Sequence, residues 1–88
     1  MPYRKLNRPL TQEVRDLLQK IFGTFSYTTD APDKSHDYIF FNVFKGQDLV
    51  MEVTVKRYVG TTKCRVKGNY IVDAVIRGKI CTWVQSLL

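Results

Sequence analysis

The sequence predicts an α+β fold of order αβββα: a helix, an antiparallel meander of three to four strands and a second helix, with both helices on one sheet face. Residues 14–25 and 69–88 have apolar side chains at helical spacing, and residues 38–67 are rich in aromatic and β-branched residues interrupted by turn formers. The 88 residues, 44% hydrophobic and 25% charged, have the composition of one globular domain.

The first ten residues differ from the rest of the chain in composition. They include two prolines and the three cations Arg4, Lys5 and Arg8. We therefore expect residues 1–10 to form a basic extended arm and residues 11–88 to form the folded domain.

The most strongly patterned element is a helix that begins after Thr11. A threonine here caps the helix N-terminus, and Glu13 in the first turn interacts favourably with the helix dipole. The apolar positions 14, 17, 18, 21, 22 and 25 share one face, and Gly23 is the expected C-cap.

The middle of the chain is expected to form the sheet. Residues 26–37 are rich in turn formers and are predicted to be a surface loop, in which residues 27–29 supply a short edge strand in the four-stranded version. Residues 38–44 and 49–58 form a predicted hairpin, and a turn at Gly60-Thr61 leads to a third strand over residues 62–67.

The last twenty residues allow two interpretations. A helix capped by Asn69 would place one apolar stripe on a single face, whereas Arg77-Gly78 would turn a hairpin of β-branched residues. The stripe consists of Val72, Ile76, Ile80, Trp83, Val84 and Leu87. We prefer the helix because this stripe is longer than any alternating pattern.

The predicted element order resembles that of the double-stranded-RNA-binding domain. That family begins its last helix with a lysine-rich signature, and residues 69–74 are almost uncharged. No functional residue is therefore transferred from that family to this chain.

Alternation in the second strand identifies the sheet face that packs against the helices. The residues expected to face the core are Leu49, Met51, Val53 and Val55, joined by Cys64 and Val66 of the third strand. A turn at Gly60-Thr61 would place Arg57 opposite Cys64 and Val55 opposite Val66. The opposite face would then carry Lys56, Tyr58, Lys63, Arg65 and Lys67.

Residues 38–44 are apolar on both faces of the expected strand. One face would carry Tyr38, Phe40 and Phe44, and the other would carry Ile39, Phe41 and Val43; the sequence leaves open which set is buried. An edge strand with two apolar faces needs a cover, which the amino-terminal arm, a second copy in a homodimer, or a ligand would provide.

The charge balance favours an anionic partner, either nucleic acid or an acidic protein surface. Fourteen Lys and Arg against eight Asp and Glu leave a net charge of +6. Our first hypothesis is nucleic-acid binding, in which cations neutralise phosphates and rings stack on bases. Its site residues are Lys56, Tyr58, Lys63, Arg65, Lys67, Arg4, Lys5 and Arg8. The competing explanation is a solvated cationic strand that prevents edge association.

The alternative hypothesis is a protein-binding inhibitor or adaptor, of the kind that phages and mobile elements encode. It would dock through the apolar strand, residues 38–44. Its interface residues are Tyr38, Ile39, Phe40, Phe41, Val43 and Phe44.

The sequence argues against an enzyme, a cofactor and a metal site. General acid–base chemistry needs a positioned titrating pair, and the single histidine, His36, lies in the predicted loop among Asp30, Asp33 and Asp37, where turn formation explains these residues. Two cysteines and one distant histidine do not make a zinc site.

The remaining features predict a cytoplasmic location, in the host cell if the protein is viral, without membrane association. No apolar segment approaches the ~20 residues that span a bilayer, and the amino terminus has no signal-like apolar region. Cys64 and Cys81 are accordingly expected to be reduced, buried thiols.

Overall fold

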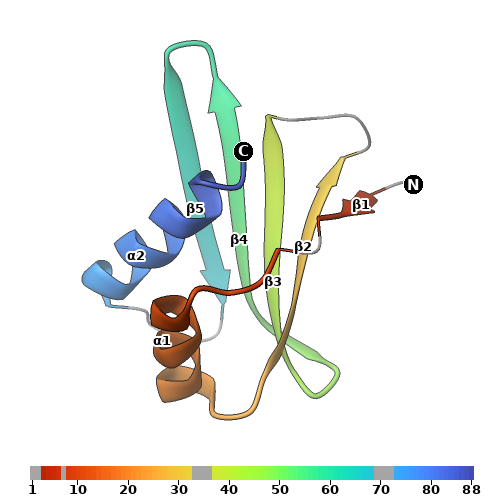
Figure 1. Cartoon of the computed structure of the whole chain (residues 1–88), viewed down its shortest axis with the longest axis vertical. Helices are drawn as coiled ribbons and strands as arrows, with labels where there is room; N and C mark the ends of the chain where they lie inside the picture. Colours follow the sequence, from red (N-terminus) through yellow and green to blue (C-terminus); the bar gives the residue numbers. More distant parts are fainter. Residues whose placement is uncertain (1–2, 7, 33–36, 69–72) are drawn as a thin grey trace.

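The computed structural model describes residues 3–6, 8–32, 37–68 and 73–88, which form two helices and a five-stranded sheet (Figure 1). The elements are β1 (Tyr3–Lys5), α1 (Gln12–Phe22), β2 (Ser26–Pro32), β3 (Tyr38–Lys45), β4 (Asp48–Tyr58), β5 (Thr61–Gly68) and α2 (Ala74–Gln85). The strands pair antiparallel in the order β1-β2-β3-β4-β5. The α+β class and the antiparallel meander are confirmed. The predicted number of three to four strands is wrong.

The two additional pairings come from segments that were expected to be a loop and an arm. β2 covers residues 26–32 of the predicted loop and pairs with β3 from Ser26 opposite Phe44 to Asp30 opposite Phe40. Only residues 27–29 were expected to form a short edge strand here, because turn-forming residue types concealed the rest of β2, although Thr29 and Ala31 alternate as buried residues along it. At the other edge of β2, Arg4 and Lys5 of β1 extend the sheet.

Helix α1 agrees with its sequence pattern at both ends. The Thr11 hydroxyl accepts a hydrogen bond from the Val14 backbone N–H at 3.3 Å, and Gly23 closes the helix with a positive φ of 74°. Its buried side chains, Val14, Leu18 and Phe22, follow the predicted apolar spacing.

Helix α2 is confirmed against the hairpin alternative, and Asp73 caps it by accepting from the Val75 N–H at 2.7 Å. Asn69 and Val72, which were expected to begin this helix, lie outside the described residues. Ile80, Trp83 and Val84 are buried, as the apolar stripe predicts. Of the two helices that the structure describes, neither is long and apolar enough to cross a membrane.

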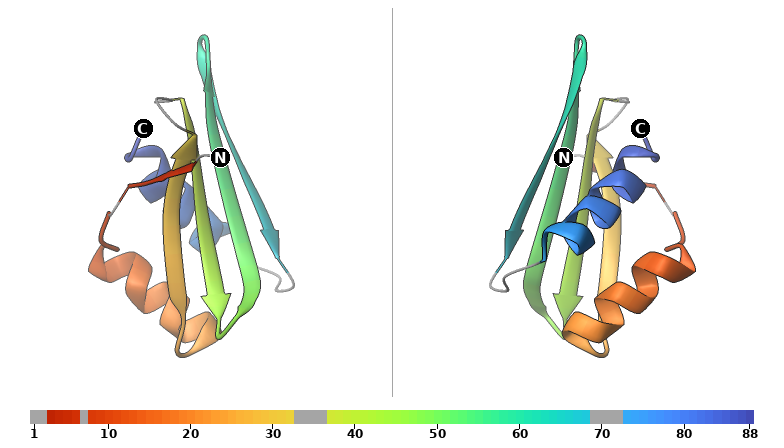
Figure 2. Two further views of the ribbon diagram at one scale, coloured as in Figure 1. Left: turned by 90° about the vertical axis from the view of Figure 1, so that its right-hand side faces the viewer. Right: turned by 90° about the vertical axis from the view of Figure 1, so that its left-hand side faces the viewer.

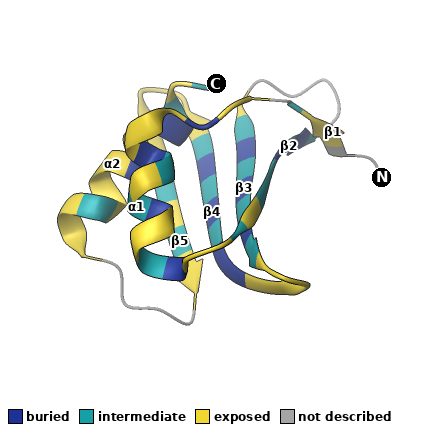
Figure 3. Cartoon of the chain, turned by 60° about the horizontal axis from the view of Figure 1, so that its bottom comes forward, coloured by how far each residue is buried: buried dark blue, intermediate teal, exposed yellow. Residues whose placement is uncertain are grey.

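The core lies between the helices and one face of the sheet. Figure 2 shows α1 and α2 on the same side of the sheet, and a surface ion pair joins them, with Lys79 Nζ at 2.6 Å from Glu13 Oε1. Buried and less buried residues alternate along β3 and β4 (Figure 3). The core-facing strand residues are Ile39, Phe41 and Val43 of β3 and Met51, Val53 and Val55 of β4.

Two details of strand register differ from the prediction. The β3–β4 pairing shifts between Val43 and Phe44, so Leu49 is 47% exposed whereas Val50 is buried. Leu49 was therefore wrongly assigned to the core. In the next hairpin Tyr58 pairs with Thr61, so the turn is one residue earlier than predicted.

The corrected turn moves the β4–β5 pairing by two residues. Val55 lies opposite Cys64, and Val53 lies opposite Val66. Because side chains alternate with a period of two, this change leaves every residue of β5 on its predicted face.

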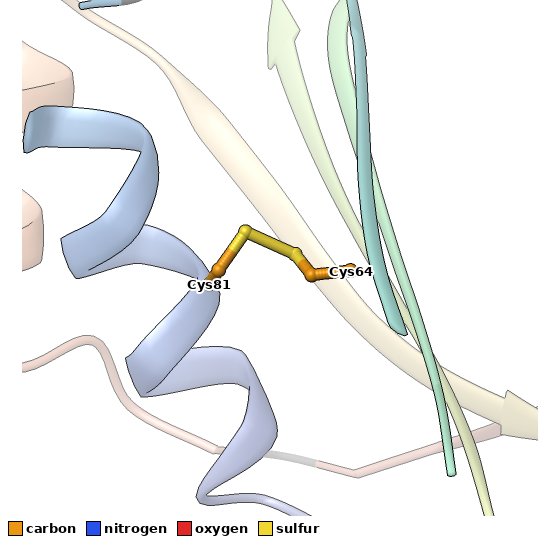
Figure 4. Close-up of a disulfide and its surroundings, with 2 residues drawn as sticks. All are labelled: Cys64 and Cys81. Carbon is orange, nitrogen blue, oxygen red and sulfur yellow. A yellow bond between two sulfur atoms is a disulfide. The ribbon is translucent and has the colours of Figure 1, made fainter. Parts of the chain in front are cut away.

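A disulfide between Cys64 of β5 and Cys81 of α2 corrects the prediction of two reduced thiols (Figure 4). Both cysteines are partly buried between the strand and the helix, with their Cα atoms 6.0 Å apart, a separation that a disulfide spans. Disulfides persist in oxidising environments, so this bond weighs against the cytoplasmic location expected from the sequence.

Removal of the disulfide is expected to destabilise the fold. The two cysteines are 17 positions apart, and a crosslink that closes a loop of this size restricts the unfolded chain. Replacing both with serine should lower the free energy of unfolding by about 3 kcal/mol, measured by urea denaturation. Each single serine variant, and the wild type under reductant, should lose a similar amount. A double variant as stable as the oxidised wild type would contradict the crosslink.

Candidate nucleic-acid interface

Strand β3 is the central strand of the sheet, which corrects the expectation of an edge strand in need of a cover. β2 pairs along one side of β3 and β4 along the other. A central strand packs one face on the core, while side chains of two neighbouring strands flank its other face. Its two-sided apolar character therefore follows from its place in the sheet and requires no partner.

The predicted protein interface on this strand is divided between the two faces of the sheet. Ile39, Phe41 and Val43 are at most 2% exposed and belong to the core, so no partner reaches them in the folded chain. The other three residues, Tyr38, Phe40 and Phe44, lie on the opposite face, hereafter the outer face, and are half-buried.

Four cations predicted for nucleic-acid contact lie together on the outer face. Lys56 of β4 lies opposite Lys63 of β5, and Arg65 and Lys67 follow Lys63 at alternate positions. Directly opposed residues share a sheet face, so these side chains emerge on the same side as Tyr38 and Phe40. Lys63, Arg65 and Lys67 are exposed, and Lys56 is half-buried.

Aromatic rings lie beside two of these cations, Lys56 and Lys63. The Lys56 Nζ lies 5.3 Å from the ring centroid of Tyr38 and 4.9 Å from that of Tyr58, and the Lys63 Nζ lies 5.3 Å from the Tyr58 centroid. These distances are within the range of cation–π attraction. The Tyr38 ring in turn contacts Phe40 at a centroid distance of 4.9 Å. Rings and cations thus alternate from β3 to β5, with Tyr58 43% exposed.

The basic arm contributes to the outer face only in part. Lys5 pairs with Asp30, which lies opposite Phe40, so Lys5 is on the outer face. Arg4 pairs with the buried Ala31 and therefore lies on the helix side of the sheet. The structure thus separates Arg4 from the cations of β4 and β5, with which the sequence analysis had grouped it.

Arg8 lines a different depression. Its carbonyl oxygen accepts a hydrogen bond from the Tyr27 hydroxyl at 3.4 Å. A depression of about 420 Å³ lies here, beside β2, and is lined by Lys5, Arg8, Pro9, Tyr27, Thr28 and Thr29. Arg8 is therefore not part of the cation group on β4 and β5.

Two carboxylates also lie on the outer face. Glu52 lies opposite Lys67, and Asp30 lies opposite Phe40. The period-two pattern of β4 predicts Glu52 on this face, whereas Asp30 was expected in a loop and was not predicted as a residue of this face. His36 and Asp33 of that predicted loop lie outside the described residues. Within residues 3–6, 8–32, 37–68 and 73–88, no group of three or more His, Cys, Asp or Glu side chains is arranged to hold a metal ion.

Comparison of the chain with models of protein families, with curated protein sequences and with solved structures found no match. The assignment of function therefore depends on the chemistry of the outer face.

The division of β3 between two faces predicts unequal effects of neighbouring substitutions. Phe41 is fully buried, with ring centroids 5.1 Å from Trp83 and 5.9 Å from Tyr27, so Phe41→Ala should lower the free energy of unfolding by about 3–5 kcal/mol. Phe40→Ala, at a half-buried position, should lower it by about 1–2 kcal/mol. Thermal or urea unfolding of both variants gives the comparison. Equal losses would show that Phe40 is a core residue.

Proposed function

We propose that this protein is a non-enzymatic binding module that binds single-stranded nucleic acid through the outer face of its sheet. The observation that carries the proposal is the group of four cations on β4 and β5, two of which, Lys56 and Lys63, lie against the rings of Tyr38 and Tyr58. Lysine and arginine neutralise phosphates, and each neutralised phosphate releases counterions.

The spacing of the β5 cations suits a flexible polyanion. Alternate residues of a strand are about 6.6 Å apart, so Lys63, Arg65 and Lys67 form a row about 13 Å long along an exposed strand. A row of this length contacts more than one phosphate of a bound strand. It lies on the last strand of the sheet, where one side is open to a ligand.

Rings beside this row favour a single strand over a duplex. Bases of a single strand expose their faces and stack on aromatic side chains, whereas bases of a duplex are already stacked. Tyr58, at 43% exposure, is the most accessible ring on this face among the described residues, and Lys56 and Lys63 flank it. A ring between two cations offers a stacking surface and phosphate contacts together.

The proposal predicts a change in the salt dependence of binding when the row is removed. In the variant K63A/R65A/K67A, affinity for single-stranded DNA and RNA should fall, and the slope of log K against log salt should decrease by about 0.7 per lost phosphate contact, or roughly two in all. Fluorescence anisotropy titrations between low and moderate salt measure both quantities.

The matched control is R15A/K20A/K45A, which removes the same number of positive charges from α1 and from the end of β3. It should retain the wild-type slope. The proposal is wrong if the row variant binds like this control, or if the wild type binds no nucleic acid at low salt. Equal affinity of the wild type for duplex and single-stranded probes would contradict the preference for single strands.

A further inference from the structure

A depression of about 240 Å³ lies on the outer face, at some distance along the sheet from Tyr58. It is lined by Asp30 of β2, Phe40 and Asn42 of β3, and Glu52 of β4. The strand register brings these side chains together, because Asp30 lies opposite Phe40 and Asn42 lies opposite Glu52. Its size suits one planar group rather than a whole nucleotide.

Most of the polar atoms around this depression are hydrogen-bond acceptors. Asp30 and Glu52 carry carboxylates, which accept and do not donate. The Asn42 amide nitrogen donates one of its two N–H groups to the Thr28 hydroxyl at 3.3 Å, and its Oδ1 is a further acceptor. The Phe40 ring, held against Tyr38, supplies the apolar wall. A matching ligand is flat and carries neighbouring N–H donors on one edge.

Cations surround the two carboxylates. Lys5 lies opposite Asp30, and Lys67 lies opposite Glu52. Arg65 is the neighbouring residue of β5 on the same face of the sheet. These three positive charges disfavour a cationic ligand such as an arginine side chain, although its guanidinium has suitable donors. They favour a neutral donor group attached to an anionic backbone.

We propose that this depression binds a guanine base of the single strand, an inference that rests on the proposed function. Guanine presents its N1–H and N2–H₂ donors side by side, and a carboxylate accepts such a pair. Uracil and thymine would turn carbonyl oxygens toward Asp30 and Glu52. Adenine and cytosine each place a ring-nitrogen acceptor beside their amino donor. Guanine is thus the base whose edge best fits this acceptor-rich site, with its ring against the apolar wall that Phe40 supplies.

Single-base substitution in a short oligonucleotide tests this selectivity. The probes are 12-mers of dT, and RNA 12-mers of U, with one central base changed to guanine, adenine or hypoxanthine, which lacks the N2 amino group. The wild type should bind the guanine probe roughly 5- to 100-fold more tightly than the unsubstituted probe, and the hypoxanthine probe at an intermediate level. In the variant D30N/E52Q, the ratio of the affinity for the guanine probe to the affinity for the unsubstituted probe should fall close to one.

The matched control is D16N/D48N, which neutralises two exposed carboxylates outside the depression. Any general gain in affinity from lost negative charge should be equal in the two variants. The ratio of the affinity for the guanine probe to the affinity for the unsubstituted probe therefore reports on the depression alone. Equal wild-type affinity for all probes overturns the guanine site and leaves the proposed function standing. Absence of binding to every probe at low salt overturns both. Displacement of the guanine probe by N-acetylarginine amide more readily than by guanosine would identify a cation site instead.

Discussion

The burial of Phe41 between the sheet and the helices is the constraint on which the rest of the molecule depends. Its ring is fully buried and packs edge-on against Trp83 of α2. Because side chains alternate along a strand, a buried Phe41 places Phe40 and Asn42 on the outer face. The cross-strand register then places Lys56 and Arg65 on that face as well. The cations and rings of the candidate interface are thus positioned by the packing of the opposite face.

The disulfide extends this constraint to the edge of the sheet. The core-facing residues of β5, Cys64 and Val66, are only partly buried, so packing alone holds this strand less firmly than β3 or β4. The bond to Cys81 ties β5 to α2, whose Ile80 and Val84 are anchored in the core. The cation row on β5 is therefore held in place by a covalent link that begins on the opposite face of the same strand.

Sequence patterns predicted the elements whose signals are local. Thr11 and Gly23 bound α1 as expected, and the placement of the β5 cations survived a two-residue error in the turn because alternation is unaffected by an even shift. Position within the sheet was not predictable, because pairing partners are non-local. β2 contains Asp30 and Pro32, which signal turns, so only residues 27–29 of it were expected as a short edge strand, and β3 was mistaken for an edge. Likewise, the cysteine spacing gave no indication that the fold brings the two thiols together.

The two parts of the outer face differ in how they would contribute to binding. Lys63, Arg65 and Lys67 would interact through charge, so their contribution would weaken as salt is added and would not depend on the bases bound. The acceptors around Phe40 would act through directed hydrogen bonds to a base edge, a contribution that would vary with sequence and much less with salt. Lys5 and Lys67 beside the carboxylates reduce the repulsion that Asp30 and Glu52 would exert on phosphates. A face with separate rows for charge and for base contact can therefore combine attraction to any single strand with selection of one base.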